Sequence, residues 1–133
     1  MDKGYSFSER SLNNLSECHP LLQDVFFEVI KIIDCSILEG YRNEFDQNRY
    51  FHQGLSKLRF PKSKHNKTPS LAVDVAPYPI DWSDRQRFIL LAGTVKGVAH
   101  QMDIRIRWGG DWNCNNDLSD ESFLDLPHYE LIL

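Results

Sequence analysis

Three separated positions in the chain carry side chains that could together hold a divalent metal ion. They are His65, Asp74 and His128. Two imidazoles and one carboxylate are the protein ligands of many catalytic zinc sites, in which water takes the fourth position. Zinc lowers the pKa of that water to about 7, which provides a nucleophile at neutral pH. The chemistry that this set indicates is hydrolysis.

Hydrolysis of this kind also needs a carboxylate that takes a proton from the water and passes it to the leaving amine. Asp125, three residues before His128, is the candidate for that role. Spacing alone leaves alternatives open, because a histidine followed by an aspartate nine residues later is common and usually structural. Asp125 itself could be a turn residue ahead of Leu126 and Pro127.

The candidate ligands are expected to lie in two strands and a long loop. A strand over 71–76 would place Asp74 on one face with two alanines and turn two valines to the other face. A carboxylate among such apolar neighbours is costly to bury unless it is paired or bound to a metal. His65 falls in a long loop over 54–70, and His128 begins a final strand over 128–133.

Periodicity and capping signals predict the remaining elements. Pro20 opens a helix whose apolar stripe runs to residue 33, and a second helix covers 43–53. Ser83 with Gln86 forms a capping box for a third, long helix. Strands are expected over 35–39 and 104–108, and the three tryptophans, Trp82, Trp108 and Trp112, are expected in the core. This mixture predicts an α+β fold, with a small antiparallel sheet packed against helices.

Composition limits the class of protein. With 133 residues, 41% hydrophobic and 26% charged, the chain is expected to form a single soluble domain over 1–133. No apolar run approaches the roughly 20 residues of a membrane span. The N-terminal segment lacks the features of a secretory signal, which predicts synthesis in a cytoplasm. A net charge of −4 argues against a nucleic-acid partner, although the basic stretch 57–67 could serve acidic substrates.

The candidate segments resemble the VanY-like D-alanyl-D-alanine carboxypeptidase family of zinc peptidases. The sequences SKH at 63–65, AVD at 72–74 and DLPH at 125–128 follow its SxH…AxD…(D/E)xxH signature. The similarity is greater to the phage endolysins of this group, which are L-alanyl-D-glutamate endopeptidases. Segments 39–42, 74–82 and 107–113 are also similar, so the resemblance runs from about residue 20 to the end.

The resemblance implies a hedgehog/DD-peptidase-like α+β fold and a role for each matching residue. His65, Asp74 and His128 would be the zinc ligands, and Asp125 the catalytic carboxylate. One departure from the family pattern is that two extra residues stand between His65 and Asp74. A loop insertion is cheap, so metal ligation is expected to survive it.

Two further roles come from the same resemblance. Arg42 would stabilise the developing oxyanion or hold the scissile carbonyl, which suits its charge and fixed donor geometry. Ser63 would donate a hydrogen bond to the substrate. Without the resemblance, Arg42 would be expected to pair with Glu39 or Glu44.

The polar loop 109–122 has oxygen-bearing side chains at alternate positions, as in the first half of a calcium-binding loop. These are Asp111, Asn113, Asn115 and Asp117. The sixth position is Asn116 rather than glycine, so an ordinary polar turn is the alternative.

The function that the resemblance implies is a zinc peptidase that hydrolyses the L-alanyl-D-glutamate bond of peptidoglycan stem peptides. It would be a monomeric phage lysis enzyme, made in the host cytoplasm and acting on the cell wall after release. Zn²⁺ would be its cofactor, and Ca²⁺ a second ion at the polar loop. Three alternatives remain open: a D,D-carboxypeptidase, a non-catalytic cell-wall-binding module stabilised by metal, and a metal-dependent nuclease.

Overall fold

The structure is a computed structural model that describes residues 4–133; the first three residues of the N-terminal segment lie outside the described residues. Along the chain, the elements are α1 (Glu9–Ser16), α2 (Pro20–Val29), β1 (Cys35–Glu39), α3 (Glu44–His52), the short 3₁₀ helix η1 (Lys64–Asn66), β2 (Ala72–Pro77), α4 (Arg85–Gln101), β3 (Ile106–Trp108) and β4 (His128–Leu131). The strands form one antiparallel sheet in the order β1-β2-β4-β3. The predicted α+β architecture is confirmed.

The two faces of the sheet have different environments. Val73 and Val75 of β2 and Tyr129 and Leu131 of β4 are buried in the hydrophobic core with residues of α2 and α4. Because side chains alternate along a strand, Asp74 and His128 lie on the opposite face. The sheet therefore separates the apolar core from the candidate ligands.

Helix α1 was not predicted from the sequence. Its side chains cover the free edge of β1: Ser11 Oγ accepts a hydrogen bond from the Ile37 backbone at 3.0 Å, and Asn14 donates to the Ile37 and Leu38 carbonyls at 2.9 and 3.2 Å. Covering an edge strand in this way satisfies its unpaired backbone groups. A helix of only eight residues is marginal by itself, so these tertiary contacts stabilise it.

Two of the detailed expectations were wrong. The cap of α4 is Asp84 rather than Ser83, whose hydroxyl instead donates to Asp81 at 2.6 Å. Trp108 is buried as expected, but Trp82 is 61% exposed because only one face of its ring stacks, on Phe88.

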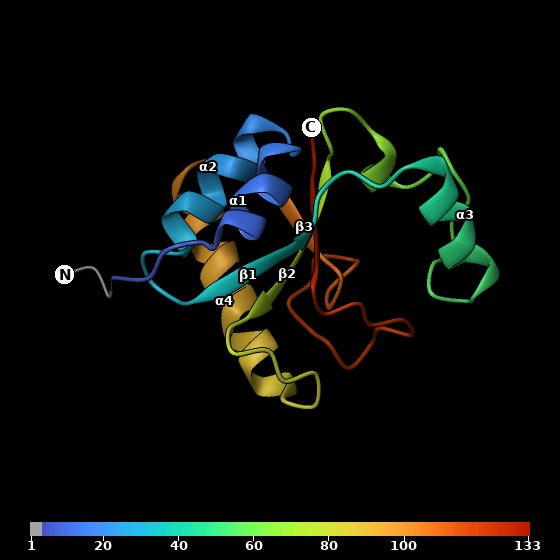
Figure 1. The fold of residues 1–133 in the computed structure, drawn as a ribbon. Coiled ribbons are helices and arrows are strands. Elements are labelled where there is room, and N and C mark those ends of the chain that lie inside the picture. Colours follow the sequence, from blue (N-terminus) through green and yellow to red (C-terminus); the bar gives the residue numbers. More distant parts are fainter. Residues whose placement is uncertain (1–3) are drawn as a thin grey trace.

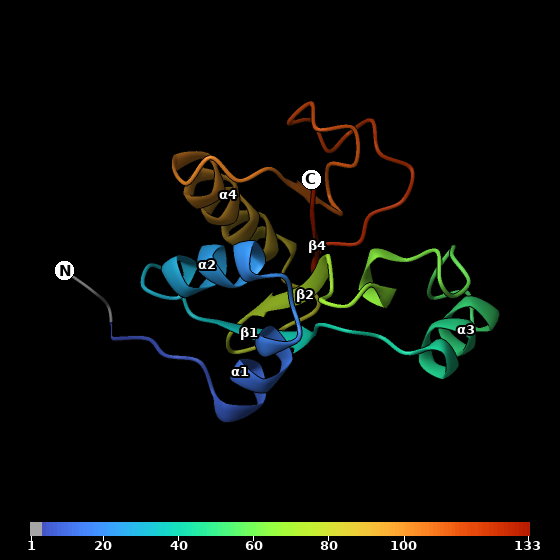
Figure 2. The same ribbon diagram turned by 90° about the horizontal axis from the view of Figure 1, so that it is seen from above.

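Helix α3 stands apart from the other helices in both views of the fold (Figures 1 and 2). Asn43 caps its start, and Gly54 follows its end with a positive φ of 76°, so α3 lies within the predicted range 43–53. The chain then returns through η1 to β2. A pocket of about 1160 Å³ lies between the segment from α3 to η1, the sheet and the loop that precedes β4. In the part of the chain that the structure describes, no helix has the length and apolar character of a membrane span.

Candidate metal centre

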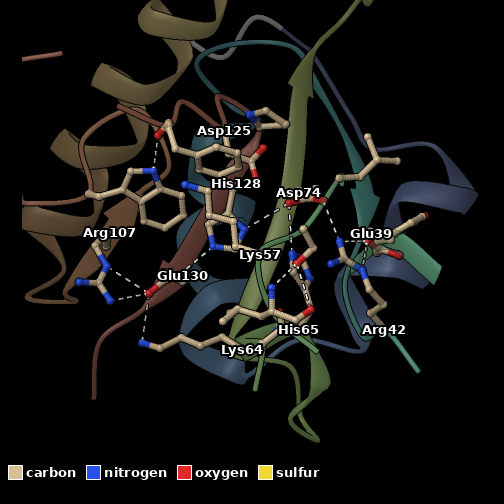
Figure 3. Close-up of a pocket in the computed structure, with 18 of the residues that line it drawn as sticks. Glu39, Arg42, Lys57, Lys64, His65, Asp74, Arg107, Asp125, His128 and Glu130 are labelled. Atoms are coloured by element: carbon tan, nitrogen blue, oxygen red, sulfur yellow. Dashed lines mark hydrogen bonds and ion pairs between the residues drawn. The ribbon is translucent and has the colours of Figure 1, made fainter. Parts of the chain in front are cut away.

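His65, Asp74 and His128 converge at the wall of the pocket (Figure 3). One ligand atom from each lies within 4.8 Å of the others. His65 Nε2 is 3.2 Å and His128 Nδ1 is 3.5 Å from the same oxygen of Asp74, Oδ1. The three residues are therefore a group that could bind a metal ion, and the two extra residues between His65 and Asp74 leave it intact.

Strand register explains the convergence. Asp74 of β2 lies directly opposite His128 of β4, and directly opposed side chains on one face of a sheet are near neighbours. His65 comes from η1, whose start is capped by Ser63. The Ser63 hydroxyl oxygen accepts a hydrogen bond from the His65 backbone at 3.2 Å, and the Ser63 backbone donates to Asn66 Oδ1 at 3.0 Å.

A second set of hydrogen bonds orients both imidazoles. His65 Nδ1 donates to the Gly40 carbonyl at 2.7 Å, and His128 Nε2 donates to Glu130 Oε1 at 2.8 Å. A carbonyl and an ionised carboxylate only accept, so these nitrogens carry the hydrogens. In the neutral form of each ring, His65 Nε2 and His128 Nδ1 are then the lone-pair nitrogens, and they are the atoms that face Asp74. This arrangement is typical of metal-binding histidines and shows that the residues fit a metal ion.

Charge at the centre favours a cation. Burial by itself would raise the pKa of Asp74, but His65 and His128 beside it hold that pKa well below its usual range. Burial by itself would lower the pKa of His128, but its contacts with Asp74 and Glu130 raise it to about 9. Asp74 is thus ionised at neutral pH and draws positive charge into the centre.

Glu130 is itself held in place by basic side chains. Arg107, opposite it on β3, donates from Nε and Nη2 at 3.1 and 2.7 Å, and the ammonium of Lys64 lies 3.4 Å away. Burial opposes the charge of Glu130, but hydrogen bonds from His128 and Arg107 lower its pKa to about 2. Glu130 is therefore a firm anionic acceptor for the His128 ring.

Arg42 supports Asp74 from the other side. Its guanidinium donates to Glu39 through Nε and Nη2 and to Gln47 Oε1 through Nη1 at 3.0 Å, and Nη2 lies 3.6 Å from Asp74 Oδ2. The ring of Tyr50 lies beneath it, 4.7 Å from the guanidinium carbon. Arg42 thus makes the pairing with Glu39 that local sequence favoured, and it also lines the pocket beside the ligands.

Asp125 lies in the same pocket, and its carboxylate accepts no hydrogen bond from the residues 4–133. Figure 3 shows it and Arg42 on either side of Asp74. Burial, and then the negative charge of Asp74, raise the pKa of Asp125 above its usual value. A carboxyl group with a raised pKa and no competing partner suits proton transfer near neutral pH.

The backbone of Gly109 positions Asp125 and His128 together. It accepts a hydrogen bond from the Asp125 amide at 2.8 Å and donates one to the His128 carbonyl at 2.8 Å. A Cβ atom at Gly109 would lie 2.1 Å from the Asp125 carbonyl oxygen, so only glycine fits.

We therefore expect Gly109→Ala to displace both functional residues and to lower kcat by about 100-fold, as small misplacements of reacting groups do. Gly93→Ala is the matched control, because nothing lies within 4 Å of a Cβ at this position in α4. It should keep full activity and stabilise the protein by about 1 kcal/mol. Steady-state kinetics and thermal unfolding of both variants test this, and an unchanged kcat in Gly109→Ala would contradict it.

The residues of the predicted calcium loop are engaged with other partners. Buried Asp111 accepts hydrogen bonds from the Lys96 ammonium at 2.9 Å and from the Asn116 amide at 2.7 Å. Asn113 and Asn115 donate to Asp120, while Asn115 Oδ1 and Asp117 Oδ1 accept from backbone amides two residues later.

Sequence reasoning missed two residues that organise the pocket. Gln47, fully buried on α3, joins Arg42 to the backbone of Leu58 through its two amide atoms. Trp112 packs its ring 5.3 Å from that of His128 and donates to the Phe123 carbonyl at 2.7 Å. Neither residue carries a local signal for this, because both roles depend on chain segments far away in the sequence.

Comparisons with known proteins identify the family of the chain. The family model described as phage L-alanyl-D-glutamate peptidase matches residues 3–132. The L-alanyl-D-glutamate peptidase of Escherichia phage T5 is 31% identical over 137 residues, which cover 96% of this chain and 98% of the phage protein. The crystal structure of Serratia marcescens L-Ala D-Glu endopeptidase ChiX has a similar fold, with a TM-score of 0.71 and 24% identity over 97% of this chain and 92% of that one. The chain therefore belongs to the phage L-alanyl-D-glutamate peptidase family.

Proposed function

We propose that this protein is a zinc-dependent endopeptidase that hydrolyses the L-alanyl-D-glutamate bond of peptidoglycan stem peptides during phage lysis. The family supplies the substrate class. The observation that carries the proposal is the ligand group of His65, Asp74 and His128, which lies in one pocket with the unpaired carboxylate of Asp125. In this proposal residues 1–133 form one peptidase domain that acts as a monomer, is made in the host cytoplasm and reaches the cell wall after release.

Each of these pocket residues has a separate role in the proposed reaction. His65 Nε2, Asp74 and His128 Nδ1 would hold the zinc ion, which supplies a Lewis acid and lowers the pKa of a coordinated water. Asp125 takes a proton from the attacking water and passes it to the amine that leaves. Arg42 offers positive charge to the carbonyl oxygen as negative charge develops there, and the Ser63 hydroxyl donates a hydrogen bond to the substrate backbone.

Product analysis tests this function. Purified peptidoglycan is digested with the zinc-loaded protein, and the new ends are identified by mass spectrometry after chemical labelling of amino groups. The proposal requires new N-terminal glutamate and C-terminal alanine at the stem peptide. Release of terminal D-alanine would instead identify a D,D-carboxypeptidase, and binding to cell walls with no new ends would identify a non-catalytic module.

Zinc affinity is expected to depend on Glu130, because this carboxylate fixes the hydrogen on His128 Nε2 and so presents Nδ1 to the metal. We expect Glu130→Gln to weaken zinc binding by about 10- to 100-fold, as changes to such outer partners typically do. Competition with a chromogenic chelator measures the affinity. Glu44→Gln, at an exposed position of α3, is the control and should match the wild type; equal affinities for all three proteins would contradict the role of Glu130.

Calcium binding at Asp111, Asn113, Asn115 and Asp117 also remains a proposal. Calcium would have to replace the Lys96 ammonium at Asp111. We therefore expect weak binding, with a Kd of about 1 mM. Activity measured against calcium concentration tests this, with Asp117→Asn as the variant that should lose the response; a flat response of the wild type rejects the calcium site.

A further inference from the structure

The cationic side chains that line the pocket fall into two groups. Three of them are paired with carboxylates: Arg42 with Glu39, and both Lys64 and Arg107 with Glu130. The other two, Lys57 and Lys62, have no carboxylate partner among the residues 4–133. Lys57 and Lys62 are therefore the cations of the pocket that have no ion-pair partner among the described residues.

Lys57 is held at the pocket wall rather than left free in solvent. Its ammonium lies over the ring of Phe123, 4.6 Å from the centroid. The residues on both sides of it are fixed by buried Gln47, whose Nε2 donates to Ser56 Oγ at 2.9 Å and to the Leu58 carbonyl at 2.6 Å. An aromatic ring attracts a cation without neutralising it, so the charge remains available to an anion.

Both lysines are connected to the metal ligands through short series of contacts. The Phe123 ring beneath Lys57 stacks on Trp112, which in turn packs against His128. Lys62 immediately precedes Ser63, the cap of the short helix that presents His65. A substrate held at the ligands would therefore lie along the wall that carries these charges.

The substrate supplies the matching anion. A glutamyl residue has two carboxyl groups, and the chain can continue through only one of them. Its amino group forms the scissile bond, so the other carboxyl group, where it is not amidated, is a free carboxylate within one residue of the reacting carbonyl.

We infer that Lys57 and Lys62 form the binding site for this free carboxylate of the glutamyl residue. The inference rests on the proposed function, because it concerns the residue on the leaving side of the scissile bond. Both ammonium groups are on flexible side chains that line one pocket, and hydrogen bonds between charged partners are about twice as strong as neutral ones. Arg42, Lys64 and Arg107 already have carboxylate partners, so this role falls to the two lysines that have none.

Amidation of the substrate tests the inference. Two disaccharide tetrapeptides are prepared, one with the free glutamyl carboxylate and one with a carboxamide of the same shape. The zinc-loaded wild type is expected to cleave the acid with a kcat/KM about 10- to 100-fold higher than that of the amide. Lys57→Met and Lys62→Met should each lower kcat/KM for the acid by about tenfold and leave that for the amide unchanged. Both positions are exposed, so the fold should tolerate these changes.

Lys67→Met is the matched control, because Lys67 belongs to the same basic stretch but does not line the pocket. Its discrimination between acid and amide should equal that of the wild type. Equal cleavage of acid and amide by the wild type overturns the inference while leaving the endopeptidase function intact. Unchanged discrimination in the double variant of Lys57 and Lys62 does the same. A wild type that cleaves neither compound overturns the proposed function together with the inference.

Discussion

The His65→Ala variant is expected to contain almost no zinc and to lose peptidase activity by at least about 1000-fold. In the proposed site His65 supplies one of three ligand atoms, and among the described residues only His65, Asp74 and His128 form such a group. A metal ion contributes several kcal/mol to stabilising the charge of the transition state, and each 1.36 kcal/mol corresponds to a factor of ten in rate. Metal content after dialysis and kcat/KM on peptidoglycan fragments measure the two effects.

The control for this variant is His100→Ala, which removes an exposed histidine of α4 far from the pocket. It should bind one zinc ion per chain and retain full activity. Because His65 is buried, circular dichroism and thermal unfolding must show that the alanine variant is folded. A folded His65→Ala protein that keeps its zinc would show that the metal lies elsewhere.

The strands, and the face of the sheet on which the Asp74 side chain lies, could be predicted from the sequence because both depend on local periodicity. β1 matches its predicted range 35–39, and β2 is shifted by a single residue from 71–76. Alternation along β2 then puts the carboxylate opposite the apolar face, whatever the strand pairs with. The convergence of His65, Asp74 and His128 could not be predicted from local periodicity. Residue types and spacing suggested a possible ligand set, but only the resemblance to a known family predicted that these three positions form one site.

Strand register and long-range contacts could not be predicted in the same way. Nothing local indicates that Asp74 lies opposite His128, because β2 and β4 are separated by about fifty residues of chain. The same limit applies to α1, which is stabilised by the edge of β1, and to Gln47, which is buried only because the segment around Ser56 folds over it. In each case the partner that stabilises the feature is distant in sequence.

Those distant contacts also define what Asp125 can do. Its backbone is tied to Gly109, which is bonded in turn to His128, so the carboxylate and a ligand move as one unit. The carboxylate itself is free of hydrogen bonds from the residues described, unlike Asp74, Glu39 and Glu130. The structure thus holds the residue in place through its main chain, which leaves its side chain available for the proton transfer proposed above.

Asp125→Asn should therefore lower kcat by about 10²- to 10⁴-fold, the usual contribution of a general acid–base group, while zinc content stays at the wild-type level. The amide has the size of the carboxylate but cannot accept the proton, and Asp125 is not one of the three grouped ligands. Asp125→Glu should recover part of the activity, since it restores the proton acceptor at a slightly different place. Asp24→Asn, an exposed position on α2, should behave as wild type. Full activity in Asp125→Asn would show that another group transfers the proton. Loss of zinc would show that Asp125 is a metal ligand. Only retained zinc together with lost turnover fits a carboxylate that moves protons beside the metal.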